Sequence, residues 1–185
     1  MIVWRVTRKA HAEQPLSGST ANKPLGGNAA NQPLSGEGAK RYGGRWNHIG
    51  VAVVYTSQSL SLATLEYLVN LSIIDLPDDL VSVEIELPDD LPRAEITIKQ
   101  LPANWRTFPS IEELKDIGTD WARQATVPVL VVPSVVIPNE LNYLVNPIHP
   151  LSQRLKVGSV AAFALDTRLY SKRKPARKRS RKVTR

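Results

Sequence analysis

Residues 81–87 alternate strictly between apolar and polar side chains, and this pattern limits the fold more than any other segment. One face of an extended strand here would carry Val81, Val83, Ile85 and Leu87. The opposite face would carry Ser82, Glu84 and Glu86. Such a period of two is typical of a strand that is buried on one face only. The chain must therefore build a sheet that covers a core with one side of this strand.

Other short segments supply further elements. Strands are predicted over residues 2–6, 51–56, 94–98, 128–132 and 160–165. A helix over 59–71 has apolar residues all round and is predicted to be mostly buried. A second helix opens at a capping box formed by Ser110 and Glu113 and continues to about Gln124. Because strands outnumber helices and short links dominate, we predict an α+β fold with mixed or antiparallel sheets.

The length of 185 residues fits one domain, expected over residues 1–170, with two additions. Residues 14–40 repeat a nine-residue unit (QPLSGSTAN, KPLGGNAAN, QPLSGEGAK), which predicts an expanded surface loop. Residues 171–185 hold nine of the 24 Lys and Arg residues and no acid, which predicts a disordered basic tail. The remaining 15 basic and 17 acidic residues give residues 1–170 a net charge of −2, so a basic domain made to coat nucleic acid is excluded.

The compartment is predicted to be the cytoplasm. The chain has no cysteine, which excludes disulfides and thiolate chemistry and fits a reducing compartment. The N-terminal residues lack the apolar stretch of a secretory signal. No run approaches the roughly 20 apolar residues that a membrane helix needs. We therefore expect a soluble protein without a membrane partner.

Glu66 is the only charged residue between Ile49 and Ile74. A carboxylate in an apolar helix is costly unless it is paired or used for chemistry. The pattern alone leaves two interpretations open with equal weight. Glu66 is either a functional carboxylate or a glutamate on the one solvent-exposed stripe of the helix.

The segment Arg41–Asn47 (RYGGRWN) joins two glycines to an arginine and two aromatic residues. The guanidinium of Arg45 suits a phosphate or carboxylate, and glycines permit close approach to a ligand. By itself the segment is more typical of a Gly-Gly turn with an anchoring Trp46. It has the spacing of neither a P-loop nor a dinucleotide fingerprint.

Ser134 follows a predicted buried strand and Pro133, at a place where polar side chains often line clefts. No Gly-x-Ser-x-Gly surrounds it, and with only three histidines in the chain a hydrolase triad is poorly supported. Ligand clusters with the spacing of a metal site are absent from the sequence, so we expect no metal site.

Taken together, these segments resemble the RES family, which is named for its Arg, Glu and Ser. The resemblance runs from about residue 2 to 165. It rests on Trp4-Arg5, on PLSGEGAKRYGGRWNHIGVAVVYTSQSLSLATLEYLVN (33–70), on Leu101-Pro102 with Trp105, on Gly118-Thr119-Asp120-Trp121, and on VPSVVIPNELNYLVNPIHP (132–150). The two extra nine-residue copies and the basic tail depart from the family pattern.

The resemblance implies a fold similar to that of ADP-ribosyltransferase toxins. It also implies a toxin that is paired with a helix-turn-helix antitoxin and cleaves the nicotinamide–ribose bond of NAD. Such an NAD glycohydrolase or phosphorylase uses water or phosphate as acceptor, with NAD as substrate and no cofactor. The implied catalytic residues are Arg45, Glu66 and Ser134. The residues implied to bind NAD are Arg5, Gly44, Trp46, Asn47, Tyr55 and Asn146.

Three alternatives and one question remain open at this point. The enzyme could transfer ADP-ribose to a protein or small molecule. The chain could also be a catalytically inactive module that binds nucleic acid through its basic tail, although the intact motif argues against this. A third possibility is that the protein binds nucleic acid only weakly through the tail, or only indirectly through the antitoxin. The sequence does not decide whether the chain forms a homodimer.

Overall fold

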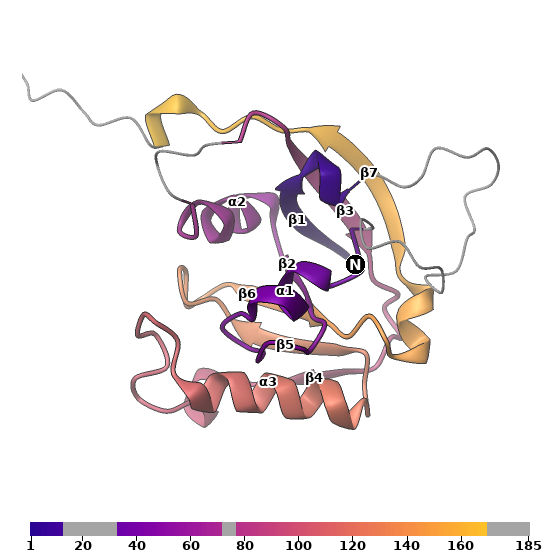
Figure 1. Cartoon of the computed structure of the whole chain (residues 1–185). Coiled ribbons are helices and arrows are strands. Elements are labelled where there is room, and N and C mark those ends of the chain that lie inside the picture. Colours follow the sequence, from indigo (N-terminus) through magenta and orange to yellow (C-terminus); the bar gives the residue numbers. More distant parts are fainter. Residues whose placement is uncertain (13–32, 72–76, 170–185) are drawn as a thin grey trace, which may run out of the picture.

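A computed structural model describes residues 1–12, 33–71 and 77–169, which share one seven-stranded sheet (Figure 1). The strand order is β4-β5-β6-β2-β1-β3-β7. The strands are β1 (Ile2–Arg8), β2 (Val54–Ser57), β3 (Leu80–Glu86), β4 (Arg93–Glu95), β5 (Val129–Pro133), β6 (Leu141–Val145) and β7 (Lys156–Ala162). Neighbouring strands pair antiparallel except β4 and β5, which run parallel. The predicted α+β class with a mixed sheet is confirmed.

In the described part of the chain, three α-helices accompany the sheet: α1 (Glu37–Tyr42), α2 (Leu60–Leu68) and α3 (Glu112–Gln124). Short 3-10 turns lie at Lys9–His11, Ile98–Gln100, Pro150–Arg154 and Thr167–Leu169. Figure 1 shows α2 above and α3 below in the view, with α1 between them. Within the described ranges, no helix is long and apolar enough to cross a membrane.

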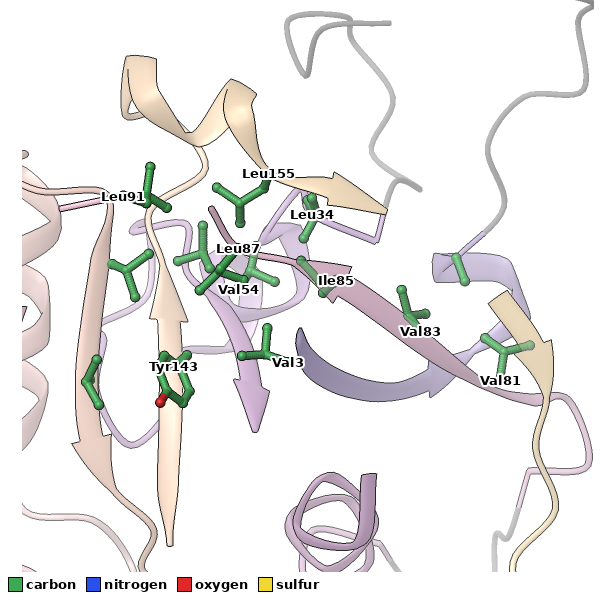
Figure 2. Packing of buried hydrophobic residues seen from close by; sticks show 14 residues of the cluster. Val3, Leu34, Val54, Val81, Val83, Ile85, Leu87, Leu91, Tyr143 and Leu155 are labelled. Atoms are coloured by element: carbon green, nitrogen blue, oxygen red, sulfur yellow. The ribbon is translucent and has the colours of Figure 1, made fainter. Parts of the chain in front are cut away.

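The alternation of side chains along the central strands divides the core between the two faces of the sheet. On β5, Val129 and Val131 join one buried cluster, whereas Leu130 and Val132 join the cluster beneath α3. The first cluster also holds the predicted apolar face of β3. Figure 2 shows Val81, Val83 and Ile85 spaced along this strand, with Leu87, Leu34 and Leu155 gathered at one end.

The helix α2 packs on the same face as α3, but it is less buried than its composition predicts. It contacts β1 through a small cluster that includes Val6 and Ala63. Only Leu62 and Ala63 of this helix are buried, and Val69 just beyond its end is 59% exposed. Apolar residues all round the helix were expected to meet protein. Instead, the C-terminal end of the helix borders a cavity, which Glu66, Val69 and Asn70 help to line.

Several predicted boundaries are wrong. The strand β6 was not predicted, and residues 37–40, assigned to a surface loop, begin the helix α1. Residues 51–53 precede β2 instead of starting it, and β4 ends at Glu95. No capping box forms at Ser110, since α3 begins at Glu112 without a side-chain cap. The last strand begins at Lys156, earlier than predicted. Most of the repeats and the predicted basic tail lie outside the described residues.

Candidate active site

A cavity of about 1060 Å³ opens between α2, the loop after α1 and the start of α3. This volume is slightly above the roughly 300–1,000 Å³ that small-molecule sites occupy. Six residues implied by the resemblance line it, namely Gly44, Arg45, Trp46, Asn47, Tyr55 and Glu66. Within the described part of the chain, Glu66 is the one carboxylate in its lining.

Glu66 lies in the last turn of α2, which follows the N-cap residue Ser59. The hydroxyl of Ser59 accepts a hydrogen bond from the backbone N–H of Leu62 and so caps the helix. The carboxylate of Glu66 is held through one oxygen only. Its Oε1 accepts from Ser134 Oγ at 2.7 Å and from Asn142 Nδ2 at 2.6 Å. None of the described residues donates to Oε2, which leaves this oxygen for a ligand.

Ser134 is fully buried and does not line the cavity. While its hydroxyl donates to Glu66, it accepts from the backbone N–H groups of Val136 and Ile137, both at 3.0 Å. These two bonds fix the direction of the hydroxyl proton toward the carboxylate. Direct contact of Ser134 with a substrate, as the resemblance implies, does not fit this placement. Its contacts suit a residue that positions Glu66.

Asn142 is the site residue that the sequence analysis missed. It lies on β6, on the face of the sheet that carries Tyr55 and Leu144. Ser57 Oγ donates to its Oδ1 at 2.7 Å, which turns the Nδ2 group toward Glu66. The available signal was the mostly apolar run of residues 141–145, in which Asn142 would share one face of a strand with Leu144. A polar residue on that face has to find a partner.

Arg45 is half-buried and lines the cavity near Glu66. Its Nη1 donates to the backbone carbonyls of Trp105 at 3.0 Å and Thr107 at 3.1 Å. Burial lowers the pKa of Arg45, while the charge of Glu66 and the phenol of Tyr55 act in the opposite direction. A cation whose surroundings compensate its charge incompletely favours an anionic ligand.

Tyr55 organises the loop that carries Arg45. Its hydroxyl donates to Asn47 Oδ1 at 2.7 Å and accepts from the backbone N–H of Trp46 at 3.0 Å. Burial raises the pKa of Tyr55, so the phenol stays neutral in the folded protein. A Cβ at Gly44 would lie 2.5 Å from the Tyr55 hydroxyl, so only glycine permits this approach.

Asn47 and Trp46 support this loop in addition to lining the cavity. Asn47 is fully buried, and its Nδ2 donates to the carbonyls of Ala39, His48 and Val51. Trp46 is 2% exposed and packs into the cluster beneath α3. Trp46 therefore anchors the Gly-Gly turn, as expected, and also lines the cavity.

Two residues implied to bind NAD lie elsewhere. Arg5 pairs with Val83 on the face of β1 that points away from α2, and its Nη1 donates to the carbonyl of Pro33 at 2.8 Å. Burial lowers the pKa of Arg5 to about 10. Asn146 is fully buried, with its Nδ2 donating to the carbonyl of Ala122 at 2.8 Å. Neither residue lines the cavity.

The arrangement joins a fixed carboxylate to a guanidinium across a cavity of ligand size. A carboxylate oriented by two donors can stabilise a positive charge that develops on a bound sugar ring. A neighbouring guanidinium can hold a phosphate or carboxylate group of the same ligand. The site is thus suited to the cleavage of a glycosidic bond in a charged molecule.

Comparison with known proteins identifies the family of this chain. The RES domain family model matches residues 2–166. The Prs ADP-ribosylating toxin of Sphingobium sp. (strain YBL2) is 43% identical over 137 residues, which cover 73% of this chain and 85% of the toxin. Toxin Res of Yersinia enterocolitica is 39% identical, covering 71% of this chain and 87% of that protein. Toxin Res of Photorhabdus laumondii is 31% identical, covering 94% and 100%.

A solved structure shares the fold. A chain of the M. tuberculosis MbcT–MbcA toxin–antitoxin complex matches with a TM-score of 0.62 at 16% identity, covering 91% of this chain and 86% of that chain. The family match extends from the first strand of the sheet to beyond the last. The protein belongs to the RES domain family.

Proposed function

We propose that this protein is a toxin enzyme of the cytoplasm that cleaves the nicotinamide–ribose bond of NAD. The observation that carries the proposal is the carboxylate of Glu66, which Ser134 and Asn142 fix at 2.7 and 2.6 Å with one oxygen left for a ligand. In the reaction, the bond between the nicotinamide nitrogen and the ribose C1′ breaks, and its electron pair leaves with neutral nicotinamide. The oxygen of the acceptor then bonds to C1′ and releases a proton.

Glu66 serves this reaction by electrostatics. Its free Oε2 stabilises the positive charge that develops on the ribose as the bond to nicotinamide lengthens. Ser134 and Asn142 hold the carboxylate in place before the substrate arrives, so little reorganisation is needed in the transition state. Arg45 binds a phosphate of the substrate, and Tyr55 is available to pack against the nicotinamide or the ribose.

The direct test is incubation of the purified protein with NAD in the presence and absence of inorganic phosphate. Release of nicotinamide with ADP-ribose identifies water as the acceptor. Release of nicotinamide with a phosphorylated ADP-ribose identifies phosphate. NAD that remains intact with folded protein, alone and with phosphate, would remove hydrolysis and phosphorolysis from consideration.

Transfer of ADP-ribose to a macromolecule is a second candidate. It is favoured by the 43% identical relative, which is named an ADP-ribosylating toxin. The same carboxylate serves both reactions, because the step that breaks the nicotinamide bond is shared. NAD labelled in its adenylate part distinguishes them: a labelled protein in a cell extract indicates transfer, whereas label that stays in small molecules indicates hydrolysis or phosphorolysis.

We also propose a separate antitoxin, of the helix-turn-helix type that the resemblance implies, that occupies the cavity. Four exposed apolar side chains are among the residues that line the cavity. Their exposed fractions are 75% for Tyr42, 71% for Ile49, 59% for Val69 and 86% for Phe108. Apolar side chains gathered at the edge of a site are typical of a protein-binding surface. A carboxylate of the antitoxin would pair with Arg45. Inhibition should then be competitive with NAD and weaker for Arg45→Ala; inhibition that is insensitive to both would contradict the proposal.

A further inference from the structure

The cavity has more basic side chains than the resemblance assigns to it. Four basic side chains are among its lining residues: Arg45, His48, Arg106 and Lys115. Two of them are already matched by acids of α3. His48 Nε2 lies 2.7 Å from Asp116 Oδ1, and Lys115 Nζ lies 2.5 Å from Glu112 Oε1. The two arginines have no such partner within the described part of the chain.

Arg106 is held at one end only. Its Nε donates to the backbone carbonyl of Val135 at 3.2 Å, in the loop that follows Ser134. Its Nη1 and Nη2 make no hydrogen bond to any described residue, although the side chain lines the cavity. A guanidinium fastened through Nε keeps two parallel donors for a planar or tetrahedral anion.

Arg45 and Arg106 are joined through the same short segment. Arg45 Nη1 donates to the carbonyls of Trp105 and Thr107, the residues on either side of Arg106. The backbone that carries Arg106 is thereby fixed against Arg45. Two neighbouring guanidiniums without carboxylate partners form a site for a ligand with more than one negative charge.

We propose that Arg106 acts with Arg45 to bind the pyrophosphate of the dinucleotide substrate. This inference rests on the proposed function and extends it to a residue outside the implied set. Arg106 supplies the second guanidinium that was expected from Arg5, which lies on the opposite face of the sheet. The shared chemistry, a phosphate group, also fits an inorganic phosphate acceptor, and the experiment separates the two sources.

The test measures binding and catalysis of the full chain for Arg106→Ala and Arg106→Lys. Binding of ADP-ribose is measured by calorimetry in phosphate-free buffer, so that neither catalysis nor the acceptor takes part. Steady-state cleavage is measured for NAD and for nicotinamide riboside, which has the reacting bond but no phosphate. Arg123→Ala is the matched control, because Arg123 is an exposed arginine of α3 that does not line the cavity.

Arg106→Ala should weaken ADP-ribose binding and raise the KM for NAD by about 10- to 100-fold, as expected for hydrogen bonds to a charged group. The kcat for NAD and the cleavage of nicotinamide riboside should stay within about twofold, and Arg106→Lys should recover part of the affinity. A structural role through Val135 would instead impair both substrates equally.

Three outcomes would overturn the inference: unchanged ADP-ribose binding in Arg106→Ala, no ADP-ribose binding by the wild type, or an effect confined to the KM for inorganic phosphate. The proposed function fails separately. If the wild type does not cleave NAD while ADP-ribose binding still depends on Arg106, the anion site is supported and the proposed reaction is wrong.

Discussion

At the scale of single residues, the site places a carboxylate where the backbone does not favour it. Glu66 lies in the last turn of α2, where the partial negative charge of the helix C-terminus repels an anion. The hydroxyl of Ser134, the amide of Asn142 and the charge of Arg45 compensate for this position. The carboxylate is therefore positioned by its hydrogen bonds to β6 and to the loop after β5, with the charge of Arg45 in support, and not by its own helix.

Ser134→Ala tests the positioning of this carboxylate. The change removes one donor to Glu66 and leaves the N–H groups of Val136 and Ile137 without their acceptor. We expect kcat for NAD to fall about tenfold or more with little change in KM, and stability to fall by about 1–3 kcal/mol. Kinetics and urea unfolding measure the two effects.

Ser159→Ala is the matched control for this variant, since Ser159, on the exposed strand β7, also donates to a glutamate, Glu84 of β3. It should change neither quantity by much. An unchanged kcat in folded Ser134→Ala would show that Glu66 does not depend on this hydroxyl.

Tyr55→Phe should reduce stability at neutral pH by about 1–3 kcal/mol, because the Trp46 N–H and Asn47 Oδ1 lose their partner. It should also alter the pH dependence. Burial raises the pKa of Tyr55 above the value of about 10 in the unfolded chain, so its contribution is fully present below pH 10 and lost at higher pH.

Urea unfolding at pH 7 and at several values above pH 10 measures both effects. The wild type should lose more stability than Tyr55→Phe over the alkaline range. Tyr42→Phe serves as control, because Tyr42 is 75% exposed. Parallel pH profiles for wild type and Tyr55→Phe would show that Tyr55 is not shielded in the way described.

At the scale of elements, the helix α3 and the Arg45 loop depend on one close contact. A Cβ at Gly118 would lie 1.9 Å from the carbonyl oxygen of Trp46, closer than any real contact. The neighbouring Thr119 accepts the backbone N–H of His48 at 3.0 Å. The helix thus approaches the loop backbone to backbone, and this approach sets the position of Arg45.

Gly118→Ala should therefore destabilise the protein by about 1–3 kcal/mol or more and lower NAD cleavage, although alanine is the better helix former. Gly38→Ala in α1 is the control, since its Cβ meets nothing within 4 Å and should leave stability equal or raise it by about 0.5–1 kcal/mol. Thermal unfolding of both variants checks this. Equal stability of Gly118→Ala and wild type would mean that α3 is free to shift.

The elements differ in how far the sequence predicts them. The strand β3 was predicted from its alternation, because each polar side chain there faces away from the main core. The strand β6 was missed because Asn142 interrupts an apolar face, and only its bond to Glu66 in a distant helix explains the asparagine. The end of α2 was expected to be buried because the sequence does not reveal that Glu66, Val69 and Asn70 line a cavity there.

The site shows the same limit. Arg45 and Glu66 were identified through their motif, and the structure brings both to the cavity. Arg106 has no motif around it, so the sequence does not mark it. Its role is suggested only by the folded structure, in which its segment contacts the loop after α1 and the loop after Ser134. Arg5 was assigned to the pocket by the resemblance, and only the register of β1 with β3 reveals that it faces away.

At the scale of the whole molecule, one face of the sheet serves for packing and the other also carries the candidate active site. One face carries the large cluster of Figure 2, and the other carries α2, α3 and the cavity between them. Among residues 1–12, 33–71 and 77–169, those that line the cavity extend no further along the chain than Asn142. The chemistry is thus built by the part of the chain that the family model matches.

Deletion of residues 171–185 should accordingly leave NAD cleavage unchanged. These residues hold nine basic side chains and lie beyond the family match, which ends at residue 166. Comparison of kcat/KM for the full chain and the truncation measures the effect. If the tail binds nucleic acid, that binding should weaken steeply with salt and disappear in the truncation. Loss of NAD cleavage in a folded truncation would show that the tail shapes the site.

The central claim is that the carboxylate of Glu66 stabilises the transition state of NAD cleavage, and Glu66→Gln tests it most directly. Glutamine keeps the size of the side chain and can still accept from Ser134 and Asn142, but it removes the negative charge. The measurement is the rate of nicotinamide release from saturating NAD by wild type and variant of equal thermal stability. We predict a loss of at least about 100-fold, corresponding to roughly 3 kcal/mol. A folded Glu66→Gln variant that releases nicotinamide within a few-fold of the wild-type rate would contradict this account.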